Sequence, residues 1–264
     1  MFSFFRSRRR RALLAEPFPP GWLDILNRNV GHYPRLAPAE QDRLRDLTRI
    51  LVAEKEWEGA KGLVVTDEMK VTIAAQAALL LLGLPEHDYF SRVASVIVYP
   101  AGFEVPDLDE FGMEDDTFPP LALDGQSVRR GPVIVSWEHA LAEGRDPACG
   151  QNIVVHEFAH QLDDLDGLSN GTPPLDDPAL SDRWHDVMQA AFDDHRAALG
   201  RGEETFFTEH AGENETEFFA DAAETFYCCP ADLRAECPDV YALLAGYFRV
   251  DPVKWFPEAV GDGE

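Results

Sequence analysis

Two histidines and a glutamate near the middle of the chain have the spacing of a metal-dependent hydrolytic site. They belong to the stretch IVVHEFAHQLD, residues 153–163, in which His156 and His160 are four positions apart. On a helix this spacing places both imidazoles on one face, one turn apart, where they can bind the same cation. Glu157 can then take a proton from a water molecule on the metal, as in the HExxH arrangement of zinc peptidases. The alternative is a pair of ordinary histidines on a packed helix.

A catalytic zinc site needs a third protein ligand, and a second predicted helix carries candidates for it. Residues 214–228 read NETEFFADAAETFYC, and their acidic residues Glu217, Asp221 and Glu224 form one stripe among phenylalanines. Burying such carboxylates is costly unless a cation or hydrogen-bond donors compensate the charge. An alternative for Glu217 is a capping box, in which its side chain bonds to the Asn214 amide. Composition alone does not choose between Glu217 and Glu224 as the ligand.

Acidic residues also follow the first motif directly. Asp163 or Asp164 is a candidate acceptor for the second ring N–H of a ligand histidine, an interaction that often orients such ligands. The alternative is that both aspartates end the helix and face solvent.

Several further segments follow the order found in a known family. Together with HEFAHQLDDLDG and NETEFFADAAETFY, the segments PFPPGW, EKEWEGAKGLVVTDEMKVTIAAQAALLLLGL, IVYPAGF and GPVIVSW cover most of the chain. The chain thereby resembles the Mlc titration factor A family of zinc-dependent peptidases and, more distantly, the catalytic domain of anthrax lethal factor. The resemblance implies a zincin-like fold and a zinc ion held by His156, His160 and Glu217. It further implies that Glu157 is the general base and that the protein is cytoplasmic; one family member binds a glucose-responsive transcriptional repressor.

Two positions depart from the family's pattern. Relatives carry a tyrosine seven residues before the ligand glutamate, well placed to donate a hydrogen bond to the developing oxyanion, and this chain has His210 there. A histidine can do the same when the ring nitrogen facing the oxyanion bears a proton, so His210 is a candidate catalytic residue; the alternative is a surface histidine. The family's long loop also carries a histidine that can reach over the metal, whereas this chain reads GMEDD at residues 112–116. Inhibition by the loop would have to use Glu114, Asp115 or Asp116.

The composition limits which partners the protein can bind and in which compartment it acts. The chain has 264 residues, 45% of them hydrophobic, and a formal net charge of −25. That charge argues against nucleic-acid binding, because phosphate neutralisation needs clustered lysine and arginine. The longest apolar run, residues 71–84, is too short for a membrane span, and no secretory signal is convincing. We therefore expect a cytoplasmic protein; a peptide or protein substrate is what the resemblance implies.

The predicted helices and strands that position these residues indicate a single domain, preceded by a short N-terminal lead. Residues 1–20 are basic and then proline-rich, and we expect a frayed terminus rather than a surface for an anionic membrane or partner. No linker or repeat divides residues 21–264. Strands are expected at residues 63–65, 93–99 and 133–136, and helices at residues 21–29, 38–57, 66–84, 153–163, 182–199, 214–228, 232–237 and 240–249.

These elements predict an α+β, zincin-like fold that is mostly helical with a small mixed sheet. The strand at residues 133–136, followed by a turn-rich link at 138–150, is placed like the edge strand on which zinc peptidases lay an extended substrate. The acidic segment at residues 101–130 is either a lid over the site or a solvated excursion.

The function that follows is a zinc-dependent amino- or endopeptidase, which hydrolyses peptide bonds through a zinc-bound water activated by Glu157. The alternative is a metal-stabilised regulatory protein that sequesters a transcriptional repressor, with weak or incidental hydrolysis.

Overall fold

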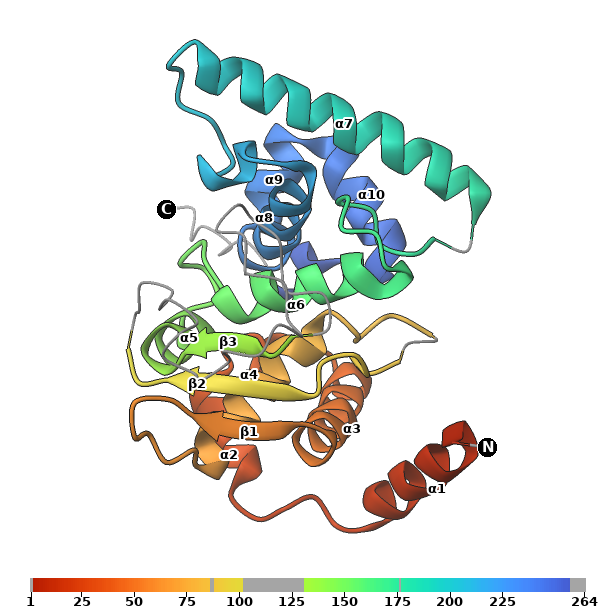
Figure 1. Cartoon of the computed structure of the whole chain (residues 1–264), viewed down its shortest axis with the longest axis vertical. Coiled ribbons are helices and arrows are strands. Elements are labelled where there is room, and N and C mark those ends of the chain that lie inside the picture. The colour runs from red at the N-terminus through yellow and green to blue at the C-terminus, as the bar shows by residue number, and fades with distance from the viewer. Residues whose placement is uncertain (1, 86–87, 102–130, 176, 257–264) are drawn as a thin grey trace, which may run out of the picture.

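The computed structural model describes residues 2–85, 88–101, 131–175 and 177–256, without the side chains of residues 2–5 (Figure 1). It is mostly helical, with a small three-stranded sheet, as expected for an α+β protein. The acidic segment at residues 101–130, whether lid or solvated excursion, lies outside the described residues except for Ala101, and so do Glu114, Asp115 and Asp116. No helix in the described ranges combines the length and the apolar character that crossing a membrane requires.

The α-helices follow one another around the sheet and the motif helix. Their bounds are α1 (Phe2–Ala15), α2 (Trp22–Asn29), α3 (Pro38–Glu54), α4 (Asp67–Leu79), α5 (Trp137–Arg145), α6 (Ile153–Asp163), α7 (Pro178–Gly200), α8 (Glu215–Cys228), α9 (Pro230–Glu236) and α10 (Pro238–Phe248). Short 3₁₀ helices are η1 (Tyr33–Arg35), η3 (Asp164–Asp166), η4 (His210–Gly212) and η5 (Pro252–Trp255). The link expected at residues 138–150 is wrong in its first half, because α5 begins there with the Ser136 hydroxyl accepting the His139 N–H.

The sheet differs from the expected one in membership and direction. Its strands β1 (Glu56–Gly59), β2 (Ser95–Tyr99) and β3 (Val133–Ser136) are all parallel, in the order β1-β2-β3, so the sheet is not mixed. The strand expected at residues 63–65 is wrong, since β1 occupies that edge instead. One reason is that α3 ends at Glu54 and the buried Lys55 ammonium donates to the carbonyls of Tyr89 and Val93, at 2.9 and 3.0 Å. This draws the following residues alongside β2.

The N-terminal lead is also more ordered than expected. Residues 2–15 form α1, which contacts α3. The Arg10 guanidinium forms an ion pair with Glu54 at 2.7 Å, and Arg49 donates to the Leu13 carbonyl. Arg10 and the Leu13 carbonyl of the lead therefore have partners on α3, which a frayed terminus would lack.

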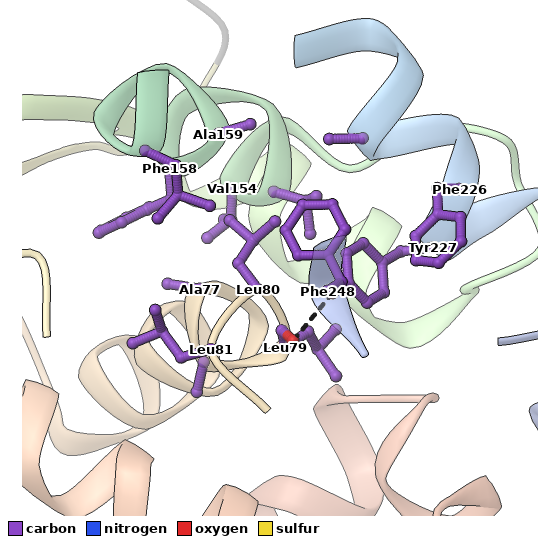
Figure 2. Close-up of a cluster of buried hydrophobic side chains, with 14 of the residues drawn as sticks. Ala77, Leu79, Leu80, Leu81, Val154, Phe158, Ala159, Phe226, Tyr227 and Phe248 are labelled. Atoms are coloured by element: carbon purple, nitrogen blue, oxygen red, sulfur yellow. Dashed lines mark hydrogen bonds between the residues drawn. The ribbon is translucent and has the colours of Figure 1, made fainter. Parts of the chain in front are cut away.

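Helix α6, which carries the HExxH motif, lies between the two halves of the molecule. Figure 1 shows the sheet and α2–α5 on one side of it and α7–α10 on the other. Val154 and Phe158 of α6 are buried in a cluster that α4, α8 and α10 complete (Figure 2). In the same cluster the Tyr227 hydroxyl donates to the Leu79 carbonyl at 3.1 Å and ties α8 to α4. The motif helix is thus held rigidly by apolar packing on several sides.

Candidate metal centre

Helix α6 has a well-defined start. The Asn152 side chain accepts the Val155 N–H at 3.0 Å, an N-cap that satisfies one of the free amides of the first turn. The Glu143 carboxylate accepts the Ile153 N–H at 2.6 Å, which also places a negative charge at the positive end of the helix dipole. These contacts set where the helix begins, and therefore which face carries the motif histidines.

The side chains of both motif histidines are directed at one carboxylate. The Nε2 atoms of His156 and His160 lie 3.2 and 3.4 Å from Oε2 of Glu217 on α8. His160 and Glu217 are buried, and α6 packs closely on α8. The structure therefore brings together the three residues expected to bind zinc.

Glu217 is turned toward the histidines and away from the start of its own helix. The Asn214 side chain accepts the Glu217 N–H at 3.0 Å, so the first half of the alternative, a capping box, is present. The Glu217 carboxylate, however, contacts the imidazoles. Burial raises the pKa of Glu217, but hydrogen bonds with His156 and His160 outweigh it and hold the pKa well below its usual range. Its charge is thus compensated by the site.

Glu224 orients the first histidine. Its Oε2 lies 3.1 Å from His156 Nδ1, and its other oxygen accepts the Asn152 N–H. Burial lowers the pKa of His156, while hydrogen bonds with Glu217 and Glu224 raise it to about 10. Sequence reasoning had left Glu224 as an alternative ligand. Its place on the same stripe as Glu217 was the available signal for a role at this site.

The aspartates expected to orient a ligand histidine have other partners. Asp163 accepts the backbone N–H groups of Gly171 and Thr172 at 2.9 and 2.8 Å, and Asp164 accepts from the Ser169 hydroxyl. His160 Nδ1 is buried and has no hydrogen-bond partner among the described residues. The orienting role is therefore wrong for both aspartates, and so is the alternative that they face solvent, since both are buried and Asp163 supports the loop after α6.

Glu157 lies on α6 between the two motif histidines in sequence and is half-buried. Burial raises the pKa of its carboxyl, and the neighbouring His160 and His156 lower it in part. A raised carboxyl pKa brings the group closer to the range in which it can both accept and return a proton.

His210 reaches the same carboxylate from the exposed side. Its Nε2 lies 3.0 Å from Glu217 Oε2, and its Nδ1 lies 2.8 Å from Glu213. Within the described ranges, potential ligand atoms of His156, His210 and Glu217 lie within 4.8 Å of one another, close enough to hold a metal ion. The structure thus places all five expected site residues in one region.

The donor atoms fit a zinc ion. Zinc takes imidazole nitrogen and carboxylate oxygen at about 2.0–2.2 Å in tetrahedral sites, so neighbouring donors should lie about 3.3–3.5 Å apart. The Nε2 atoms of the three histidines lie 3.2, 3.4 and 3.0 Å from Glu217 Oε2. Measured from Glu217 Oε2, each imidazole is therefore close to zinc spacing, although the described residues whose ligand atoms all lie within 4.8 Å of one another are His156, His210 and Glu217, without His160.

Comparisons with known proteins agree with this chemistry. A family model described as glucose-regulated metallo-peptidase M90 matches residues 4–249. The chain belongs to this family. It is similar to an uncharacterized protein of Synechocystis sp., with 30% identity over 93% of this chain and 89% of that protein. It is equally similar, at 30% identity, to Mlc titration factor A of Yersinia pestis and of Yersinia pseudotuberculosis, over 88% of this chain and 85% of each relative. The resemblance to the Mlc titration factor A family is thereby confirmed.

Proposed function

We propose that this protein is a zinc-dependent peptidase of zincin-like fold, with His156, His160 and Glu217 as metal ligands. The observation that carries the proposal is the approach of two Nε2 atoms from α6 to one carboxylate oxygen from α8, at 3.2 and 3.4 Å. Membership in a metallo-peptidase family supports it independently.

Each residue of the centre then has a distinct task. Zinc, when bound, supplies a Lewis acid that polarises a peptide carbonyl and acidifies water. Glu157 accepts the proton of the attacking water and delivers it to the leaving amine. Glu224 keeps the His156 ring in place by accepting its Nδ1–H, so that Nε2 faces the metal.

The substrate is proposed to be an extended peptide. In the described part of the sheet, β3 is an edge strand, paired with β2 alone, and it contacts α6. Backbone groups on the free side of an edge strand can bind an extended chain in any sequence, with side-chain pockets adding selectivity. A peptide bound there would run close to the motif helix.

Metal analysis and peptide hydrolysis test this function together. Purified protein should contain about one zinc per chain and cleave members of a panel of short chromogenic peptides. In Glu157→Gln, zinc content should persist while turnover falls by about 10²–10⁴-fold, the range typical of a lost general base. Glu236→Gln, an exposed glutamate on α9, is the matched control and should behave as wild type. Undiminished hydrolysis by Glu157→Gln would exclude the assigned mechanism.

A second function is favoured by the names of the two Yersinia relatives, Mlc titration factor A. We propose, as the alternative, that this chain sequesters a transcriptional repressor of the Mlc kind and that hydrolysis is incidental. A pull-down with Glu157→Gln separates the two, because sequestration survives this change and proteolysis does not. Capture of an Mlc-type repressor by the variant, with no peptide cleaved by the wild type, would favour the regulatory function.

A further inference from the structure

The short segment that carries His210 is anchored on two long helices. The Thr208 hydroxyl donates to the buried Asp221 of α8, and the Thr208 carbonyl lies 3.0 Å from Nε2 of His195 on α7. Gly212 lies so close to α7 that an added Cβ would come within 2.6 Å of the Leu199 side chain. The backbone on either side of His210 is therefore held, although the His210 side chain is 53% exposed.

The His210 ring is oriented by a carboxylate. Nδ1 lies 2.8 Å from Oε1 of Glu213, three residues further along the chain. An ionised carboxylate can only accept a hydrogen bond, so the ring proton belongs on Nδ1. A neutral imidazole has one N–H, which leaves Nε2 with a lone pair. Glu217 Oε2, 3.0 Å from Nε2, is itself a carboxylate oxygen that can only accept, so this lone pair is productive when a cation lies between the two atoms.

His156 has the same pair of carboxylate contacts. Its Nδ1 faces Glu224 at 3.1 Å and its Nε2 faces Glu217 Oε2 at 3.2 Å. The two rings are stacked, with planes 26° apart and centroids separated by 6.2 Å. An outer carboxylate on one nitrogen and a lone pair aimed inward from the other is the usual environment of a metal-binding histidine. By this criterion His210 is better prepared as a ligand than His160, whose Nδ1 has no partner in the described chain.

We propose that His210 is a further metal ligand and that Glu213 positions it. The inference rests on the proposed zinc centre and adds a third imidazole to it. A metal-binding role replaces the oxyanion-stabilising role expected for His210. Donation to an oxyanion requires a proton on Nε2, whereas Glu213 stabilises the tautomer whose proton is on Nδ1. Because His210 is the exposed member of the metal-binding set, it is also the ligand that solvent or substrate can replace most easily.

Zinc affinity and ligand counting test this inference without relying on activity. Affinity is measured at constant pH by competition with a chromophoric chelator, and X-ray absorption of the zinc-loaded protein counts imidazole ligands. We expect three imidazoles in the wild type and two in His210→Ala, with zinc affinity about 10- to 100-fold weaker. Glu213→Ala should retain three imidazoles and lose about tenfold in affinity, the lower end for removal of an outer carboxylate. His185→Ala, an exposed histidine on α7, is the control and should match the wild type.

The outcomes separate this inference from the proposed function. Two imidazoles in the wild type, with unchanged affinity in His210→Ala, would overturn the role of His210 and leave the His156, His160 and Glu217 centre standing. A wild-type protein that binds no zinc at all would remove both. Weaker binding in His210→Ala together with the loss of one imidazole supports the inference, even if no peptide substrate is found.

Discussion

The buried and exposed sides of the metal centre are built in different ways. On the buried side, His156, His160 and Glu217 project from two long helices whose other faces are packed in the core, and their side chains are at most 12% exposed. On the exposed side, His210 begins a 3₁₀ helix of three residues and Glu213 follows its end. Their side chains are 53% and 54% exposed. Both sides direct an imidazole nitrogen at the same carboxylate oxygen.

The two sides should therefore contribute differently to folding and to metal binding. Ligands on packed helices keep their geometry whether or not substrate is bound, because moving them disturbs the core. A ligand on a short exposed segment can move at little cost in packing. We therefore expect substitutions on the buried side to affect both folding and metal binding, and those on the exposed side to affect metal binding alone.

The largest effect is expected from Phe158→Ala, which removes a buried ring from the core face of α6. Phe158 is 2% exposed and packs against Phe90 with ring centroids 4.9 Å apart. The loss of buried area and the resulting cavity should lower the free energy of unfolding by about 3–5 kcal/mol. Urea denaturation measures this. Leu168→Ala, at a side chain that is 56% exposed, is the control. A loss below about 1 kcal/mol in Phe158→Ala would show that α6 is not held by this core.

His156→Ala should come next, through metal binding. Structural zinc sites are worth about 10–16 kcal/mol over four ligands, so one ligand accounts for about 3–4 kcal/mol, or a 100- to 1,000-fold change in affinity. The same chelator competition measures it. If His156→Ala weakened zinc binding no more than His210→Ala does, the proposed difference between the buried and exposed sides would be wrong.

A buried histidine outside the centre should make folding depend on pH. Burial lowers the pKa of His32 from 6.5 to about 4, and the hydrogen bond to the Tyr227 carbonyl offsets this only in part. Below pH 6.5, His32 is protonated in the unfolded chain, whereas in the folded chain it stays neutral down to about pH 4. Stability therefore falls as the pH drops through this window. The contribution is about 3 kcal/mol. It is measured as the stability difference between wild type and His32→Gln at each pH, and a difference that does not change across the window would contradict it.

The smallest of these effects is expected for Glu224→Gln. The amide has one acceptor oxygen, so if it still accepts the His156 Nδ1–H its NH2 faces the Asn152 N–H, and it lacks the charge that makes the imidazole a stronger ligand. We expect zinc affinity to fall by about 10- to 100-fold with the fold intact by circular dichroism. Because the Glu224 side chain is 13% exposed and that of Glu213 54%, a smaller loss here than in Glu213→Ala would reverse the order of the two sides.

Local patterns were sufficient where contacts lie within one element. His156, Glu157 and His160 fall within two turns of one helix, so helical spacing alone placed them correctly relative to one another. The acidic stripe of α8 was also visible in the sequence. What the stripe could not show was the separate partner of each residue: Glu217 meets the histidines, Asp221 meets Thr208 and Glu224 meets His156.

The sequence by itself determined the motif, its family and a mostly helical protein, because these depend on short-range spacing and on segments in a fixed order. Only the tertiary structure decided that Glu224 orients His156 and that Glu213 orients His210 beside the same carboxylate. It also decided that β1 forms from residues 56–59, in parallel with β2. A four-residue strand has too few side chains to show a pattern, and its hydrogen bonds come from a segment almost forty residues away. Such pairings depend on how α6 and α8, or β1 and β2, pack together, which neighbouring residues in the chain do not specify.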